Sequence, residues 1–587
     1  MGTEAHYAEQ GPAGHEAVRV AQPVDQSSPL AQRGIASGLA ELEHDQRRIA
    51  GPLTLVFLGY YAVFLLLTAL APELLRVRVF ISAVTVLGVP GLIALTGYDG
   101  VFYFIGTLLS FVVVQALVAE PFRNAGRFTM ADAMVPRLRE RPVRLAMATS
   151  TISVAIIYMV AQVIGAGVLT RLLLPVDSTV AGMQPETLAI VVVGALMTIH
   201  AAYGGMLLIT WVQIVKVVLL LLGVIVTALL VLSKFGFSFD ALFASATQRS
   251  GKGGAYLGPG LRFKNPIDEV SLGIALVLGT AGLPHVMVRL YTVPSARAAR
   301  KSVTWAIGSI GMLFAMATII GFGAAALLGA KQIAAVDKTG NATVPLLIRS
   351  LGGGEQTFGG DLFLGLMAVV IFATILGALA ALMIAASSSF AHDVWASVIH
   401  HGKADEAAEV RVARRAALAI GAVAILLSVA LRQQNVAPVA VLAFAAAASS
   451  NFPVLLLSIY WRRFNTDGAL AGLLGGLISC LFLIAIGPTV MGPTGFMMKT
   501  STPLFPLANP GIVSIPIGFL AAYLGTVVSQ ERISESRIFQ VLRLKTLTGI
   551  ELADGQLAPP SAPEGRGPEG VGREVPWPTA GRHATTR

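Results

Sequence analysis

The feature that most constrains the fold is a series of long apolar runs separated by short polar segments. The chain has 587 residues, of which 55% are hydrophobic and only 13% are charged. Apolar runs of about 17 to 20 residues are long enough to cross a bilayer as helices. The sequence therefore predicts an all-α fold, a polytopic membrane helix bundle of about thirteen spans. Their approximate cores are residues 53–71, 79–96, 101–118, 145–169, 188–202, 206–232, 271–291, 303–328, 362–391, 416–431, 439–460, 468–486 and 512–528.

The charge and the cysteine content exclude several classes of protein. The formal net charge of +10 comes from basic residues in short loops between apolar runs, so nucleic acid is not an expected partner. The single cysteine, Cys480, lies inside an apolar run, which excludes a disulfide framework or a cysteine-rich metal site within one chain. The sequence shows no nucleophile–base constellation, metal-ligand cluster or phosphate loop, so neither enzyme activity nor a cofactor is expected.

One predicted span is interrupted in its middle. Between Gly279 and Ser302 the chain reads GTAGLPHVMVRLYTVPSARAARKS, in which two glycines and Pro284 break an apolar run before an arginine-rich loop. Backbone groups freed at such a break often line the binding site of a transporter. The positive end of the second half-helix can face a carboxylate. The sequence thus indicates a transporter whose substrate site lies at this break.

The loops and termini indicate an organisation and an orientation. Residues 1–50 form a polar N-terminal tail without the apolar core of a secretory signal, 51–530 a transmembrane transporter domain, and 531–587 a cytoplasmic, largely disordered C-terminal tail. Basic residues gather in alternate loops, which the positive-inside rule makes cytoplasmic, and an odd number of spans then puts the N-terminus outside. These loops hold Arg123 to Arg141, Arg297 to Lys301, Lys403 to Arg415, and Arg462 with Arg463.

Several stretches, in one order along the chain, resemble a known family. They are TGYDG (96–100), AEPFRNAGRFTMAD (119–132), AQVIGAG (161–167), GGMLLITWVQIVK (204–216), GTAGLPHVMVR (279–289), SSSFAHDVWA (387–396) and NFPVLLLSIYW (451–461). Together they resemble the acetate permease branch of the sodium:solute symporters, from about Ser82 to about Leu547. The resemblance implies an inverted-repeat core like that of neurotransmitter-sodium transporters. The first helix, within residues 47–75, resembles instead the small two-helix membrane protein that accompanies acetate permeases.

The resemblance implies a substrate site around the break. Thr280 and His285 can donate hydrogen bonds to a carboxylate, although His285 can instead brace the broken helix. Tyr158 and Gln162 share one helix face, with hydrogen bonding between helices as the alternative role. Asn451 can present its side-chain oxygen or a freed backbone carbonyl to the cavity. The implied substrate-binding residues are Ser82, Tyr158, Gln162, Gly279, Thr280, Gly282, His285 and Asn451.

The chain departs from the family pattern in the region where sodium-binding members hold their ion. Their first core helix contributes backbone oxygens near the positions of Arg78 and Ile81, but the acidic residue that is usual in this region is absent. A later helix contributes paired hydroxyls where this chain has Gly377 and Ala378, so Thr374 is the nearest alternative ligand. Sodium needs several oxygen ligands, so weak sodium dependence is expected and protons compete as the coupling ion. Arg78 either substitutes for the ion or anchors the helix at the membrane face.

These observations predict a cation-coupled secondary transporter. It is expected to carry acetate or another short monocarboxylate with Na⁺ or H⁺, by alternating access, in the bacterial cytoplasmic (inner) membrane. Expected partners are the small monocarboxylate, the lipid bilayer and a small accessory membrane protein. Two alternatives stay open: a non-transporting sensor or accessory protein with a symporter fold, and a symporter for another small organic solute. Asp393, at a helix end beside charged loops, is interpreted as a solvated structural carboxylate.

The loop charges predict which ends of the helices face the cell exterior. With Cys480 replaced by Ser, Lys252→Cys should react with a membrane-impermeant maleimide added to intact cells. Arg414→Cys should react only after the membrane is permeabilised, because its loop is expected to be cytoplasmic. External labelling of Arg414→Cys but not of Lys252→Cys would show that the protein has the opposite orientation to the one predicted.

Overall fold

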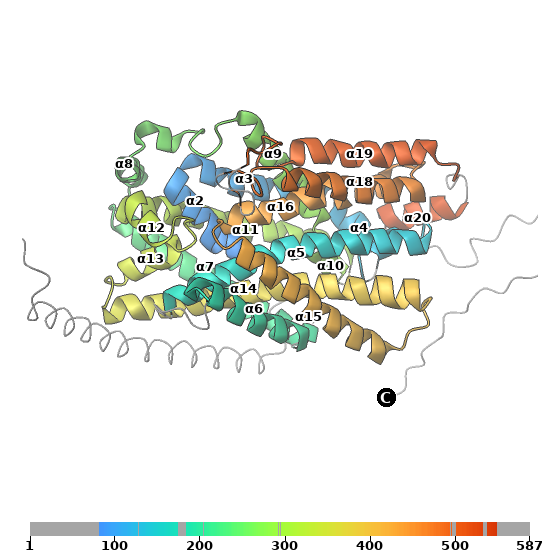
Figure 1. Cartoon of the computed structure of the whole chain (residues 1–587), viewed down its shortest axis with the longest axis horizontal. Coiled ribbons are helices and arrows are strands. Elements are labelled where there is room, and N and C mark those ends of the chain that lie inside the picture. Colours follow the sequence, from blue (N-terminus) through green and yellow to red (C-terminus); the bar gives the residue numbers. More distant parts are fainter. Residues whose placement is uncertain are drawn as a thin grey trace, which may run out of the picture.

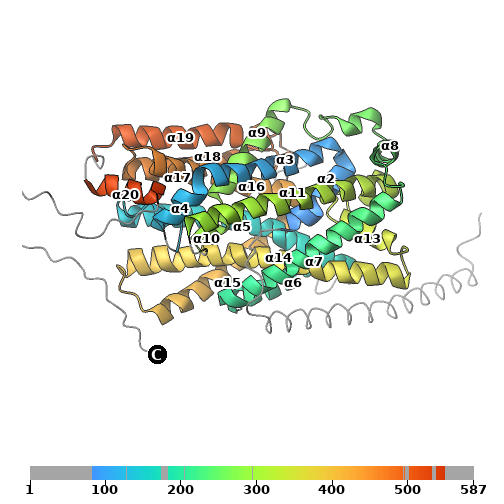
Figure 2. The same cartoon turned by 180° about the vertical axis from the view of Figure 1, so that it is seen from behind.

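The computed structural model describes residues 82–126, 128–173, 183–203, 205–291, 293, 295–492, 495, 501–531 and 537–548, and only the backbone of residues 205–218 and 537–542. Every regular element in this part of the chain is a helix. The long helices run side by side along the long axis of the molecule (Figures 1 and 2). The all-α expectation is therefore confirmed for the described residues.

The helices follow one another with short connections. In the first half they are η1 (Val84–Gly88), α2 (Val89–Thr96), α3 (Tyr98–Val113), η2 (Val114–Val118), α4 (Ala119–Ala125), η3 (Ala131–Ala133), α5 (Glu140–Leu173), α6 (Pro185–Tyr203), α7 (Gly205–Ser233), α8 (Phe239–Ser250), η4 (Gly253–Leu257), α9 (Pro266–Gly279), η5 (Thr280–Gly282) and α10 (Pro284–Tyr291). In the second half they are α11 (Ala296–Leu327), α12 (Ala330–Val336), α13 (Thr343–Leu351), α14 (Phe358–Ser388), η6 (Ser389–Ile399), α15 (Glu406–Ala430), α16 (Val436–Ser449), α17 (Asn451–Tyr460), α18 (Thr466–Ala485), α19 (Gly511–Val528) and α20 (Arg537–Thr548).

Ten helical segments of the described chain are long and apolar enough to cross a membrane, and residues 84–96 and 219–233 form two shorter apolar helices. These twelve segments follow the predicted order of spans from the second to the last. The predicted first span, 53–71, lies outside the described residues. The N-terminal tail, for which an orientation is predicted, lies outside them as well. The predicted total of thirteen spans is thus not confirmed, although a multi-pass membrane protein is.

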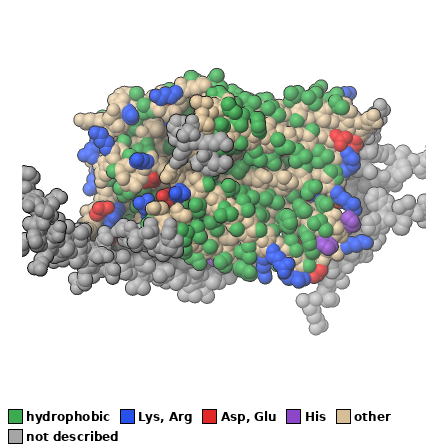
Figure 3. Space-filling view, viewed as in Figure 1, with side chains coloured by type: hydrophobic (Ala, Val, Ile, Leu, Met, Phe, Trp, Pro, Cys, Tyr) green, Lys and Arg blue, Asp and Glu red, His purple; other side chains and the backbone are tan. Residues whose placement is uncertain are grey.

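Burial separates central helices from peripheral ones. Of the most apolar 18-residue window, 78% is buried in α5, 83% in α14 with η6, and 94% in α16 with α17, against 28% in α15 and 33% in α19. Figure 3 shows the consequence on the surface, where a broad hydrophobic region separates the Lys and Arg side chains gathered at the two ends. Since large apolar side chains such as Leu426 (71% exposed) and Ile478 (63% exposed) cover the flank, this surface suits lipid.

The predicted interruption is present between α9 and α10. The α-helix ends at Gly279, a single 3₁₀ turn follows, and Leu283 is extended (ψ 118°) before α10 begins at Pro284. Proline lacks the N–H that a continuous helix would need here, and it disfavours a helical conformation at the residue before it. The turn η5 packs against α3 and α16. The break is therefore enclosed at the centre of the bundle, as the sequence predicts.

Small residues bring three helices close together, as expected in lipid. A Cβ atom at Gly476 of α18 would lie 1.9 Å from the carbonyl oxygen of Ser449, at the end of α16. A Cβ atom at Gly518 of α19 would lie equally close, 1.9 Å, to the same oxygen. Only glycine permits this approach of α18 and α19 to α16, the helix that supports the break.

Gly476→Ala should lower the thermal stability of the purified protein in detergent. Its methyl group meets a backbone oxygen that cannot move alone, at a cost of about 1–3 kcal/mol. The matched control is Gly308→Ala in α11, where a Cβ atom meets nothing within 4 Å. The control should keep or slightly raise the melting temperature, because alanine favours helix. Equal melting temperatures for the two variants would contradict the close approach.

Candidate functional site

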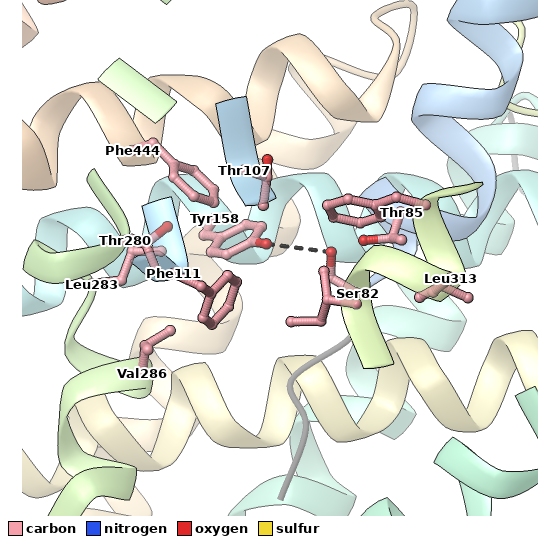
Figure 4. A pocket seen from close by; sticks show the side chains of 12 residues that line it. Ser82, Thr85, Thr107, Phe111, Tyr158, Thr280, Leu283, Val286, Leu313 and Phe444 are labelled. Carbon is pink, nitrogen blue, oxygen red and sulfur yellow. Dashed lines mark hydrogen bonds between the residues drawn. The ribbon is translucent and has the colours of Figure 1, made fainter. Parts of the chain in front are cut away.

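A small central cavity lies beside the break in the α9–α10 span. Its volume is about 40 Å³. Its walls come from η1 with the preceding residue Ser82, and from α3, α5, η5, α10, α11 and α16 (Figure 4). The lining residues are Ser82, Thr85, Thr107, Phe111, Tyr158, Thr280, Leu283, Val286, Ile310, Leu313, Phe314 and Phe444. Segments far apart in the sequence thus enclose one space at the level of the break.

Hydroxyl groups lie at several points of the cavity wall. The Tyr158 hydroxyl donates a hydrogen bond to Ser82 Oγ at 3.3 Å, as Figure 4 shows. The Thr280 hydroxyl lies 2.6 Å from Ser110 Oγ. Ser110 donates its own proton to the Thr107 carbonyl at 2.6 Å, so Thr280 is the donor toward Ser110. Rotation of the Thr280 hydroxyl would turn this proton toward an acceptor in the cavity.

Apart from Thr85 and Thr107, the rest of the lining is apolar. Phe111 and Phe444 contribute rings, and Leu283 and Val286 contribute aliphatic groups from either side of Pro284. The Tyr158 and Phe444 rings meet edge to face, with 5.6 Å between their centroids. The cavity therefore offers both hydroxyl groups and hydrocarbon to a ligand.

Asn451 supports the break from behind the cavity. Its Nδ2 donates to the carbonyl oxygen of Gly282 at 2.8 Å, and its Oδ1 accepts from the Ser150 hydroxyl at 2.6 Å. Ser150 also lies 2.8 Å from the Ser450 hydroxyl. Asn451 is fully buried and pairs a carbonyl that the interrupted helix leaves without its usual partner.

The two predicted glycines face α16 rather than the cavity. A Cβ atom at Gly279 would lie 2.6 Å from the Phe444 carbonyl oxygen, and one at Gly282 would lie 2.4 Å from that of Ala447. A side chain at either position would displace α16 instead of filling the cavity. The glycines set how closely the break approaches its support.

His285 and Gln162 form a layer behind the lining. The His285 ring is 2% exposed and lies 5.3 Å from the Tyr158 ring, centroid to centroid. Gln162 is fully buried, and its Oε1 accepts from the Ala83 backbone N–H at 3.0 Å. This bond joins the residues just before η1 to α5. Gln162 lies one helical turn after Tyr158 on α5.

The structure thus brings the eight predicted substrate residues together in two layers. Ser82, Tyr158 and Thr280 line the cavity, whereas Gln162, Gly279, Gly282, His285 and Asn451 surround it. Sequence reasoning missed most of the lining. Thr85 follows Ser82 by three residues on one helix face, and Leu283 flanks the proline, so these two carried a signal. The lining residues on α3 and α11 had no sequence feature that would have pointed to the cavity.

The region predicted for a cation lies partly outside the described residues, since Arg78 and Ile81 fall there. On α14, Thr374, Gly377 and Ala378 are all buried. The Thr374 hydroxyl donates to the carbonyl of Val370, one turn earlier, at 2.8 Å. The cation role of these residues stays a prediction.

An ion-pair network closes the bundle at the end where α4 and α20 lie, here called the α20 end (right in Figure 1). Arg144 Nη1 donates to Asp393 Oδ1 at 2.7 Å and to Asp132 Oδ1 at 2.9 Å, and Arg144 Nε donates to Glu140 at 2.8 Å. Asp393 is fully buried, so the expectation of a solvated carboxylate was wrong. Its burial is possible because a guanidinium from α5 compensates its charge.

Aromatic side chains pack at the end of α10 that lies farther along the chain from the central cavity lining. Tyr291, at the end of α10, stacks on Phe122 of α4 with 4.6 Å between ring centroids and 16° between planes. The half-helix α10 packs against α4, α5 and α14. These contacts hold α10 against its neighbouring helices.

Comparison with known proteins gives matches to symporters and transporters. The model of the sodium:solute symporter family matches residues 77–476, and that of a protein of unknown function, DUF485, matches residues 37–98. The uncharacterized symporter YwcA of Bacillus subtilis is 44% identical over 81% of this chain and 89% of its own length. The monocarboxylic acid transporter of Corynebacterium glutamicum is 41% identical over 80% of this chain and 86% of its own length.

Among solved structures, the chain resembles the substrate-bound outward-open state of a Na⁺-coupled sialic acid symporter. The TM-score is 0.59 at 15% identity, covering 82% of this chain and 98% of that one. This likeness concerns the fold alone. The resemblance noted in the sequence, to a symporter with an accessory-protein helix at its start, is confirmed by the two family matches.

Asn451→Ala should loosen the break. Removing the amide leaves the Gly282 carbonyl and the Ser150 hydroxyl without this buried partner, at about 1–3 kcal/mol. Hydrogen–deuterium exchange of residues 279–291 should then accelerate by roughly 5- to 150-fold, if exchange follows local opening. The control is Ser153→Ala on α5, whose exposed hydroxyl bonds only to the Thr149 carbonyl of its own helix among the contacts described. Unchanged exchange in Asn451→Ala would show that the amide does not hold the break.

Proposed function

This chain belongs to the sodium:solute symporter family, and from that membership we propose that it carries acetate or another short monocarboxylate across the bacterial cytoplasmic membrane. Transport is coupled to a cation and proceeds by alternating access. The protein performs no covalent chemistry on its substrate. The single observation that carries the substrate class is the size and character of the central cavity.

The cavity volume supports a substrate of a few non-hydrogen atoms. A volume of about 40 Å³ compares with roughly 10–15 Å³ needed to hold one water by the same kind of measure. Pockets for drug-sized ligands span roughly 300–1,000 Å³. Acetate and propionate are of the right scale, whereas a sugar would require the walls to separate. The printed name of the Corynebacterium glutamicum relative, a monocarboxylic acid transporter, supports the same class.

The wall chemistry suits a carboxylate with a short alkyl group. The hydroxyls of Ser82, Tyr158 and Thr280 are donors within the lining, and the N-terminus of α10 adds the positive end of its dipole. The hydrocarbon of Val286 and Phe444 would receive the methyl end. Hydrogen bonds to an ionised acceptor are stronger than neutral ones, so the hydroxyl wall would set the orientation.

For the coupling ion we propose weak dependence on sodium, with protons as the main alternative. Gly377 and Ala378 supply no side-chain oxygen, and Thr374 is the nearest hydroxyl on α14. Sodium sites require several oxygen ligands in one shell. A chain that lacks a hydroxyl pair at these positions would bind sodium weakly.

Labelled acetate uptake into proteoliposomes tests the proposal. Wild-type protein should accumulate acetate, and Val286→Phe should abolish uptake because the larger side chain fills the central cavity. Leu426→Phe is the matched control, since Leu426 is 71% exposed on the flank and should tolerate a ring. Propionate should compete with acetate, whereas a six-carbon acid should not.

Separate gradients of sodium and of pH then identify the coupling ion. Uptake should respond little to sodium alone. Uptake that collapses without sodium would refute the proposed weak dependence. Normal uptake by Val286→Phe, or equal competition by the six-carbon acid, would refute the assignment of the central cavity.

A further inference from the structure

A second and larger cavity lies at the α20 end. Its volume is about 420 Å³, against about 40 Å³ for the central cavity. It lies between α4, the segment leading into α5, the end of α17, and α20, which covers it. Asn124 Nδ2 of α4 donates to the Thr546 carbonyl of α20 at 3.1 Å, so α20 is joined to the core at this cavity. Figure 2 shows α20 beside α4 at this end.

The charged side chains of the lining are mostly basic. Arg137, Arg543 and Lys545 face the cavity, and His392 lies at its wall. The one carboxylate of the lining, Asp132, is engaged by Arg144 in an ion pair of 2.9 Å. Arg144 is shared with Asp393 and Glu140, so Arg137, Arg543 and Lys545 are the Arg and Lys side chains of the lining outside this network.

Arg137 is held at the cavity wall by backbone carbonyls. Its Nη1 and Nη2 donate to carbonyl oxygens at 2.6–2.9 Å, those of Ser458, Trp461, Arg462 and Phe464. Burial and the nearby charge of Arg543 lower the pKa of Arg137 to about 10, which leaves the Arg137 guanidinium charged at neutral pH. Two like charges held near each other attract an anion between them, because the anion relieves their repulsion.

We propose that this cavity is a second anion site, which holds the transported carboxylate after it leaves the central cavity, and that Arg543 and Lys545 of α20 complete it. The inference rests on the proposed function, since it takes the transported acid as the occupant. The loop charges place this end in the cytoplasm. A basic vestibule there raises the local concentration of the released anion, as clefts of one charge sign do.

The site differs from the central cavity in kind. Its volume leaves room for a carboxylate with part of its hydration shell, so recognition is by charge more than by shape. Affinity at this site should therefore be weaker and should fall with ionic strength, whereas binding in the enclosed central cavity should respond less to salt. Two binding phases with different salt dependence are the expected signature.

Equilibrium binding of labelled acetate to the full-length protein in a neutral detergent tests this. The wild type should show a tighter and a weaker phase at low salt. Combining Arg543→Gln with Lys545→Gln should weaken the second phase by about tenfold or more, because charge-assisted contacts are lost. Arg415→Gln combined with Lys403→Gln is the matched control, removing two exposed charges from α15 and the loop before it, outside the cavity.

Val286→Phe separates this inference from the proposed function. It should remove the tighter phase and leave the weaker one. A wild type without a tighter phase would count against the central cavity alone. A weaker phase that persists unchanged in the Arg543→Gln, Lys545→Gln protein would overturn the second site. Loss of the weaker acetate phase on adding phosphatidylglycerol, with no effect on the tighter phase, would identify a lipid headgroup as the occupant and also overturn it.

Discussion

The structure depends on the pairing of backbone groups at one break in a membrane span. Inside a bilayer a freed carbonyl has no water to bond to, so an interrupted helix persists only where protein groups replace its missing partners. Here Asn451 Nδ2 donates a hydrogen bond to the Gly282 carbonyl oxygen at 2.8 Å, and the Ser150 hydroxyl donates to Asn451 Oδ1. Because Asn451 begins α17 and Ser150 lies on α5, the break is tied to two other helices. The central cavity forms at this junction.

A second constraint operates at the α20 end. Asp393 and Arg144 stand 249 residues apart in the chain and meet in a fully buried contact of 2.7 Å. A buried carboxylate without its partner would be strongly destabilising, so this pair ties η6 to the start of α5. Under the proposed alternating access, the Tyr291–Phe122 stack and the Arg144 network would have to separate for the bundle to open at this end.

The sequence predicts some parts of this arrangement and not others, for physical reasons. Apolar runs mark twelve of the expected segments because length alone defines a span, and Gly282 with Pro284 marks the break because both act locally. The inward faces of α3 and α11 are not predicted, since helices that are apolar all round carry no periodic signal. Asp393 was misjudged because its partner lies on a distant helix. The two family matches overlap at residues 77–98, which include η1 and α2. Arg78, where the sequence departs from the symporter pattern, lies within this overlap.

The position of bound acetate tests most directly whether the central cavity is the substrate site. Solid-state NMR can measure the distance from the carboxyl carbon of ¹³C-labelled acetate to labelled Tyr158 and Thr280 in the reconstituted protein. We expect the carboxyl carbon to lie within hydrogen-bonding reach of both side chains, and Val286→Phe to remove this contact. Acetate bound with no measurable proximity to either residue would contradict the assignment of the central cavity as the substrate site.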